Sequence, residues 1–214
     1  MTDKLLDILK SKYPLEVIDA GEFATLKANG MKFSVRAYSA KGLGHVSVMK
    51  AKGFFGLMKM DTIMIVPQEK DLPLYSYDRI FAMGNDTLIV ELYDTCVNAP
   101  DMSSLDNVKS KYADLPERDP GEHWYDSIKL GESISKKGKK SETPRLDLMT
   151  VEHFEAYLAA NAADVSDKEQ KRELSARYVL GLLERGGPST DVFKKSLGAE
   201  ATATLFKKVL FGVG

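Results

Sequence analysis

The sequence predicts an α+β fold in which a central antiparallel sheet is sandwiched between helices. Strand-like patterns fill the first half of the chain, and helical spacing of apolar residues dominates its last third. The turns between the expected strands are short, which makes neighbouring strands antiparallel. This order of strands followed by helices is typical of helices packed on an antiparallel sheet. With 214 residues, 43% of them hydrophobic, the chain can build one sizeable core, and we expect one domain over residues 1–214.

The strand predictions depend on alternation and on turn chemistry. Asn29-Gly30 separates two strand-like runs, and this pair favours a tight hairpin because both residues tolerate positive φ. After it, Phe33 and Val35 alternate with polar residues, as in a strand with one face in water. Strands are expected at residues 22–27, 31–38, 45–49, 61–66, 78–83 and 87–93.

The helix predictions follow from apolar residues at spacings of three and four. Helices are expected at residues 3–12, 105–112, 151–160, 167–184 and 191–211, the last with a break near Gly198. Residues 115–121 are expected to form an irregular connection and residues 136–140 a basic loop.

Composition excludes several function classes. The formal charge is −1, so no overall field favours nucleic acid or a membrane, and a charged partner would need a local patch. The single cysteine, Cys96, excludes an internal disulfide and is compatible with a reducing compartment. The first residues lack the pattern of a signal peptide, and no apolar run approaches the ~20 residues that span a bilayer. We therefore expect a soluble cytoplasmic protein with no nucleic-acid or membrane partner.

Familiar catalytic motifs are missing from the sequence. It contains neither a phosphate-binding Gly-x-x-x-x-Gly-Lys-Ser/Thr loop nor a Gly-x-Gly-x-x-Gly segment after a strand. His45, His123 and His153 are scattered and have no cysteine pair beside them, so no metal site is expected. Cys96 is interpreted as a buried, unreactive thiol.

The most informative carboxylate is Asp78, in the segment Asp71-Leu72-Pro73-Leu74-Tyr75-Ser76-Tyr77-Asp78 between two apolar runs. The pattern puts Asp78 where a new strand begins. It either faces water and does nothing, or it points into a pocket on the sheet and handles protons. Tyr75 and Tyr77 could line such a pocket, but tyrosine is also a common core residue of strands.

The order of landmarks along the chain resembles the ferredoxin-dependent bilin reductases, a family related to the red chlorophyll catabolite reductases. The first landmark is Val66-Pro67 followed by the segment at residues 71–78, and the second is Leu115-Pro116-Glu117 with Trp124 after it. The third is the segment at residues 193–198 followed by Val209-Leu210-Phe211. Together these landmarks span most of the chain from about residue 62 onward.

This resemblance implies a fold and a chemistry. The fold is the same helix–sheet–helix sandwich. Ferredoxin would deliver single electrons, with no bound cofactor, and side chains would protonate a linear tetrapyrrole held between sheet and helices. Asp78 matches the family's central acidic residue, so it is the expected catalytic acid. Other positions of the family differ in this sequence. Thr62 stands where the family has a histidine, and an acidic residue of the family falls near Ser47. The family's Asp-Pro pair before the last helix is Gly187-Pro188 here.

The remaining site residues have two interpretations each. Tyr75, Tyr77, Arg36 and Thr62 are the expected substrate-binding residues. Arg36 could meet a carboxylate of the ligand in a bidentate contact, or it could lie on the wet face of its strand. The basic residues of the expected loop could steer an acidic electron carrier such as ferredoxin, or they could be a solvated run. These residues are Lys136, Lys137, Lys139 and Lys140. For the whole chain, the alternative to a reductase is a non-catalytic protein that binds a tetrapyrrole or another small ligand.

Overall fold

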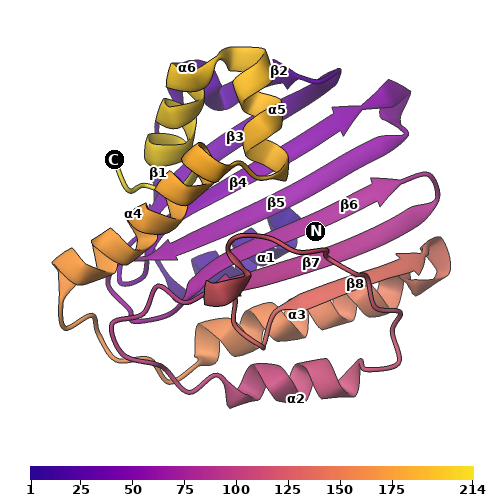
Figure 1. The fold of residues 1–214 in the computed structure, drawn as a ribbon. Coiled ribbons are helices and arrows are strands. Elements are labelled where there is room, and N and C mark those ends of the chain that lie inside the picture. The colour runs from indigo at the N-terminus through magenta and orange to yellow at the C-terminus, as the bar shows by residue number, and fades with distance from the viewer.

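One antiparallel sheet organises the fold, which is known from a computed structural model (Figure 1). The structure describes residues 1–214, with the exception of the side chain of Pro188. The sheet has eight strands in the order β1-β3-β4-β5-β6-β7-β8, and β2 pairs with β3 beside β1. The strands are β1 (Leu15–Ile18), β2 (Thr25–Ala28), β3 (Met31–Ala40), β4 (Gly44–Gly53), β5 (Met58–Pro67), β6 (Leu74–Ala82), β7 (Asn85–Tyr93) and β8 (Ile134–Lys139).

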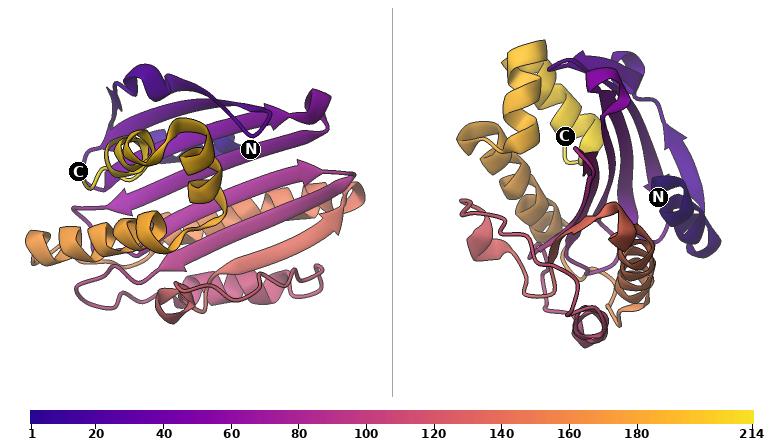
Figure 2. Two further views of the ribbon diagram at one scale, coloured as in Figure 1. Left: turned by 45° about the horizontal axis from the view of Figure 1, so that its top comes forward. Right: turned by 90° about the vertical axis from the view of Figure 1, so that its right-hand side faces the viewer.

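Helices cover both faces of the sheet, as the edge-on view in Figure 2 shows. One face packs against α1 (Thr2–Lys12), α2 (Ser103–Lys111) and α3 (Thr143–Ala159). The other face packs against α4 (Lys168–Arg185), α5 (Pro188–Leu197), α6 (Ala199–Thr204) and the π-helical segment Leu205–Leu210. Each face therefore has its own apolar core, and the predicted α+β sandwich is confirmed.

Local sequence explains how these elements begin and end. The Asn29-Gly30 hairpin forms as predicted, with both residues at positive φ (47° and 72°) between β2 and β3. Helix α4 begins at an N-cap, Asp167, whose side chain accepts a hydrogen bond from the backbone N–H of Gln170. It ends at Gly186, whose φ of 86° suits a residue without Cβ. None of the described helices is both long and apolar enough to cross a lipid bilayer.

Two predicted boundaries are wrong in a way that matters for the site. Strand β6 begins at Leu74 rather than at Asp78, so Asp78 lies in the middle of a strand and not at its start. Residues 134–139, expected in part as a basic loop, form the edge strand β8. β8 alternates buried and partly exposed positions, which the clustered lysines conceal in the sequence.

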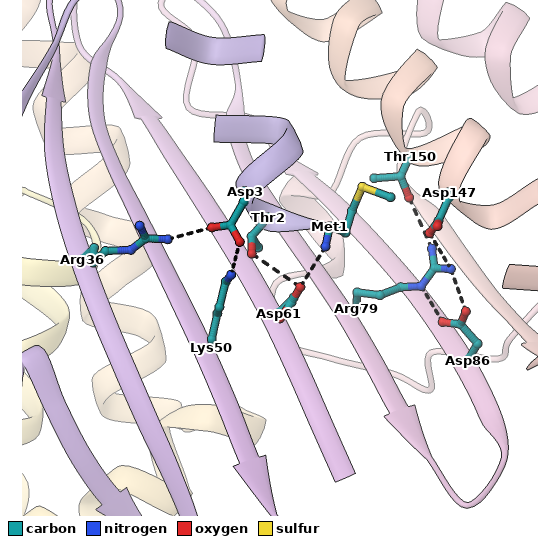
Figure 3. Close-up of polar contacts among 10 residues, drawn as sticks. All are labelled: Met1, Thr2, Asp3, Arg36, Lys50, Asp61, Arg79, Asp86, Asp147 and Thr150. Carbon is teal, nitrogen blue, oxygen red and sulfur yellow. Dashed lines mark hydrogen bonds and ion pairs between the residues drawn. The ribbon is translucent and has the colours of Figure 1, made fainter. Parts of the chain in front are cut away.

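Ion pairs of the buried Arg79 tie the α3 face of the sheet together (Figure 3). Arg79 on β6 is fully buried and pairs with Asp86 on β7, with 2.7 Å between Nη2 of Arg79 and Oδ2 of Asp86. The guanidinium also meets Asp147 on α3 at 3.2 Å. Because buried charges are costly unless paired, these contacts hold α3 in one position over β6 and β7.

Candidate functional site

The candidate site is a cavity of about 360 Å³ between the sheet and the carboxy-terminal helices. Its floor comes from side chains of β3 to β7, and its other walls come from residues 118–125, α4, α5 and the π-helical segment. Several methionines give the floor an apolar, deformable surface, among them Met58, Met60 and Met64. A cavity of this size, mostly apolar with a few polar groups, is typical of a small-molecule site.

Asp78 projects into this cavity from the middle of β6. Alternation along β6 puts Ser76, Asp78 and Ile80 on the cavity face. Thr62 on β5 is directly opposite Asp78 in the strand register, and its hydroxyl donates a hydrogen bond of 2.5 Å to Oδ1 of Asp78. The structure therefore brings together two of the predicted site residues, Asp78 and Thr62.

The surroundings of Asp78 change its acidity. Burial raises the pKa of the Asp78 carboxyl to about 6, because the charged form loses hydration. The hydrogen bond from Thr62 acts in the opposite sense, since it favours the carboxylate, and the negative charge of Glu91 adds a smaller upward shift. A carboxyl with this pKa carries a proton in a useful fraction of molecules near neutral pH.

Glu91 is a second carboxylate in the cavity and was not predicted. It lies on β7 directly opposite Ser76, and Ile89, two residues earlier on β7, is directly opposite Asp78. The hydroxyl of Tyr93 donates a hydrogen bond of 2.6 Å to Oε2 of Glu91. The alternation of Ile89, Glu91 and Tyr93 in the predicted strand at 87–93 could have put all three on one face with Asp78, had the pairing register been known.

Aromatic rings form the wall that faces Glu91. The rings of Tyr93 and Tyr178 lie 4.2 Å apart, and Tyr125 meets Tyr93 edge-to-face at 5.5 Å. Burial raises the pKa of Tyr125 above its usual value, and that of Tyr178 well above it, so both hydroxyls stay protonated. The indole N–H of Trp124 donates to the backbone oxygen of Gly186 at 3.0 Å, which fastens this wall to the end of α4.

Residues 118–125 add cationic and imidazole groups to the cavity. Arg118 lines it and donates to the hydroxyl of Ser135 on β8 at 3.3 Å. His123 stacks on Tyr125, with ring centroids 4.8 Å apart and planes at 8°. Nδ1 of His123 is buried and has no hydrogen-bond partner among the residues that the structure describes. No periodic pattern in the sequence points to either residue, because they lie in an irregular connection.

Tyr75 and Tyr77 are not in the cavity, which corrects their expected place beside Asp78. They differ from Asp78 by an odd number of residues and so point to the other face of the sheet. Both are fully buried there, and Tyr75 packs against Phe154 and Tyr157 of α3. The structure gives these two tyrosines the core-packing role that was the alternative.

Arg36 also lies outside the cavity. It is on the face of β3 that carries α1, where it is exposed and pairs with Asp3 at 3.1 Å (Figure 3). The expected contact between Arg36 and a ligand in this cavity is therefore corrected, and the wet-face interpretation fits its position.

The four lysines near residue 138 do not form one surface. Lys136 is buried, donates to the backbone oxygen of Leu115 at 3.0 Å and pairs with Glu117. Its charge is thus used inside the protein. The side chains of Lys137, Lys139 and Lys140 are exposed at the edge of the sheet.

Groups that could carry other chemistry are dispersed. Among the described residues, no set of three or more His, Cys, Asp or Glu side chains gathers closely enough to hold a metal ion. Burial raises the pKa of the Cys96 thiol to about 12, which opposes formation of a thiolate. The cavity around Asp78 therefore holds the arrangement best suited to proton transfer.

Comparisons with known proteins agree with this geometry at the level of the fold. A scan against protein-family models finds no match, and a search of curated proteins finds none either. The chain is similar in structure to phytochromobilin synthase from tomato, a ferredoxin-dependent bilin reductase whose crystal structure contains biliverdin. The TM-score is 0.71 at 15% sequence identity, over 99% of this chain and 82% of the tomato chain. The fold implied by the resemblance in the sequence is thereby confirmed.

Proposed function

We propose that this protein binds a linear tetrapyrrole in the cavity over Asp78 and reduces it with electrons from ferredoxin. The observation that carries the proposal is the carboxyl of Asp78, with its pKa raised to about 6, on the floor of an apolar, ring-lined cavity. The fold similarity to a protein that holds biliverdin supports the ligand class. The methionines and tyrosines around the cavity suit a flat, conjugated molecule.

The proposed reaction is a two-electron reduction with matching protons. Two reduced ferredoxins each give one electron and leave oxidised, and the bilin takes up two electrons and two protons to form a dihydrobilin. Asp78 supplies one proton, and at pH 7 about a tenth of a carboxyl with this pKa is protonated. The hydroxyl of Thr62 then stabilises the carboxylate that remains, until water returns the proton. Once water has returned this proton, the same carboxyl supplies the second proton, which therefore also comes from the solvent.

A specific observation also favours a second candidate, a protein that binds the tetrapyrrole without turning it over. Thr62 occupies the position where the resembling family has a histidine, and a hydroxyl cannot take part in proton transfer as imidazole does. In this candidate Asp78 and Thr62 only hold the ligand.

The two candidates are separated by measuring binding and turnover on the same samples. The protein is incubated with biliverdin under anaerobic conditions, its absorbance change gives binding, and reduced ferredoxin is then added. Asp78→Asn is compared with Asp61→Asn, because Asp61 is on the neighbouring strand but bonds to the amino terminus outside the cavity. The reductase predicts a new bilin spectrum that Asp78→Asn abolishes and Asp61→Asn retains.

Each other result decides between the candidates. Saturable binding by both variants with no spectral change after ferredoxin would support the binding protein and contradict the reductase. Failure of the unmodified protein to bind biliverdin at all would contradict both.

A further inference from the structure

Four lysines form a continuous row across the open part of the sheet, on the face that does not carry the cavity. In the strand register Lys27 is opposite Lys32, Lys32 is opposite Lys52, and Lys52 is opposite Lys59. All four side chains are exposed. Directly opposite residues have Cβ atoms only about 5 Å apart, and like charges at this distance destabilise a sheet. We call this set the lysine row.

No carboxylate of the described residues forms an ion pair with the lysine row. Two acids on the same side of the sheet, Asp3 and Asp61, have other partners, as Figure 3 shows. Asp3 bridges Arg36 and Lys50, and Asp61 accepts from the amino terminus at 3.2 Å. Among the described residues, the charge of the lysine row is therefore not neutralised by an ion pair.

An apolar loop joins the two strands that carry the last two members of the lysine row. The segment Phe54–Leu57 connects β4 to β5 and is bracketed by Lys52 and Lys59. Phe55 is completely exposed and Leu57 is 75% exposed, whereas large apolar side chains usually find cover. Phe54 and Phe55 both have positive φ (51° and 55°), a strained backbone for bulky residues.

The neighbouring hairpin repeats this arrangement. Met83 connects β6 to β7, is 94% exposed and has a φ of 50°. Because Ala82 is opposite Met58 in the register, the two hairpin tips lie at the same end of the sheet (Figure 1). We call Phe54, Phe55, Leu57 and Met83 the apolar tips. Strained residues persist where the structure over-determines them, which is a feature of functional sites.

From these two features we propose that this end of the sheet docks on an anionic lipid surface, with the apolar tips inserted among the lipids and the lysine row on the headgroups. Lysines beside apolar and aromatic side chains are the usual means of peripheral membrane binding. A protein partner would need a continuous interface of about 800 Å² on this chain. The apolar tips comprise only four side chains, far fewer than the roughly 20–30 residues of such an interface, whereas a fluid lipid surface accommodates short apolar loops singly. The near-zero charge of the whole chain conceals this patch, and composition alone therefore predicted no membrane partner.

The position of the cavity gives the docking a consequence. Phe54 and Met58 line the cavity as well as belonging to the end of the sheet that we propose to dock. A molecule partitioned in the lipid would thus meet the cavity beside the apolar tips. The docking proposal itself does not depend on the reductase activity, because lipid binding is measured without ligand or ferredoxin.

The test is cosedimentation of the purified protein with lipid vesicles. Vesicles of phosphatidylcholine alone are compared with vesicles that contain phosphatidylserine, at low and high salt. One lysine near an anionic surface contributes about a fivefold gain in affinity. Replacing the lysine row by glutamine (K27Q/K32Q/K52Q/K59Q) should therefore weaken binding to phosphatidylserine vesicles by at least about 100-fold, and high salt should weaken binding of the unmodified protein.

Matched controls separate the patch from general effects. K10Q/K12Q/K41Q/K168Q removes the same charge from exposed lysines of α1, the β3–β4 turn and the start of α4, and it should retain binding. F55S/L57S should release the protein, whereas V17S, at an exposed valine of β1, should not. Circular dichroism checks that each variant is folded.

Three results would overturn the proposal. The first is equal sedimentation with both kinds of vesicle, and the second is an equal loss in the control quadruple variant. The third is a lysine-row variant that still binds vesicles but needs more ferredoxin for half-maximal rate, which would make the patch a site for an acidic protein.

Discussion

Replacing Asp78 by asparagine should change how stability depends on pH, and this tests the central feature of the site without any ligand. The carboxyl titrates at about 6 in the folded protein and at 3.8 in its ordinary state. Between these values the folded protein holds a proton that the unfolded chain has lost. The contribution of this group to the free energy of unfolding is therefore fully present below pH 3.8 and is lost as the pH rises through 6.

The size of the effect follows from the shift. A displacement of about two units corresponds to about 3 kcal/mol of unfolding free energy at pH 7. Asparagine has the same shape, can still accept the hydrogen bond of Thr62, and has no charge to desolvate. Relative to the unmodified protein, Asp78→Asn should thus gain up to about 3 kcal/mol between pH 4 and pH 7.

Urea unfolding of both proteins at several pH values measures this difference. The other titrating groups are the same in the two proteins, so their contributions cancel. A constant difference from pH 4 to pH 7 would refute the assignment of a raised pKa to Asp78. Thr62→Val provides an internal check, because it removes the hydrogen bond that favours the carboxylate. In that variant the carboxyl resonance of Asp78 should titrate at a higher pH by NMR.

Three further predictions concern the packing on both faces of the sheet. Tyr75→Phe removes a buried hydroxyl that has no partner among the described residues. Stability should therefore change by less than about 1 kcal/mol, and biliverdin binding should not change. A loss of binding would contradict the position of Tyr75 behind the sheet. Arg79→Met leaves Asp86 buried without its partner and should cost about 3–5 kcal/mol in urea unfolding, which an unchanged midpoint would disprove. Gly181→Ala would bring a Cβ within 2.3 Å of the Trp124 ring. This clash should lower the free energy of unfolding by about 1–3 kcal/mol and alter the fluorescence of the single tryptophan. Unaltered emission would count against this contact.

The fold was predictable from the sequence because its signals are local. The alternation in β3, the Asn29-Gly30 turn and the periodicity of α4 each involve residues close in the chain. The failures occurred where a local signal was masked. β8 carries Lys136 on its buried side, where the ammonium pairs with Glu117 and donates to a backbone oxygen. The run of lysines in the sequence gives no sign of these two partners. β1 is only four residues long, which is too short to show a clear alternation of apolar and polar residues, so the sequence did not predict it.

The site was predictable only in part, because it depends on register and on distant segments. The strand pattern singled out Asp78, and the family resemblance gave it a catalytic role and added Thr62. Their contact requires β5 and β6 to pair across residues 68–73, a connection too long to determine register by turn geometry. Tyr178 reaches the cavity from α4, and His123 from an irregular connection, and neither position follows from local pattern.

Strand parity, by contrast, was available from the start and decides which residues can act with Asp78. In a regular strand successive side chains point to opposite faces, so Tyr75 and Tyr77 could share a face with Asp78 only if a bulge intervened. The register of β6 with both neighbours runs unbroken from Tyr75 to Ala82. The proposed proton chemistry therefore belongs to the face with the even-numbered positions of β6, where Thr62 and Glu91 are the polar residues on the neighbouring strands. The odd-numbered positions, with buried Arg79 among them, hold α3 against the back of the same strand. One strand thus positions the acid on one face and the supporting helix on the other.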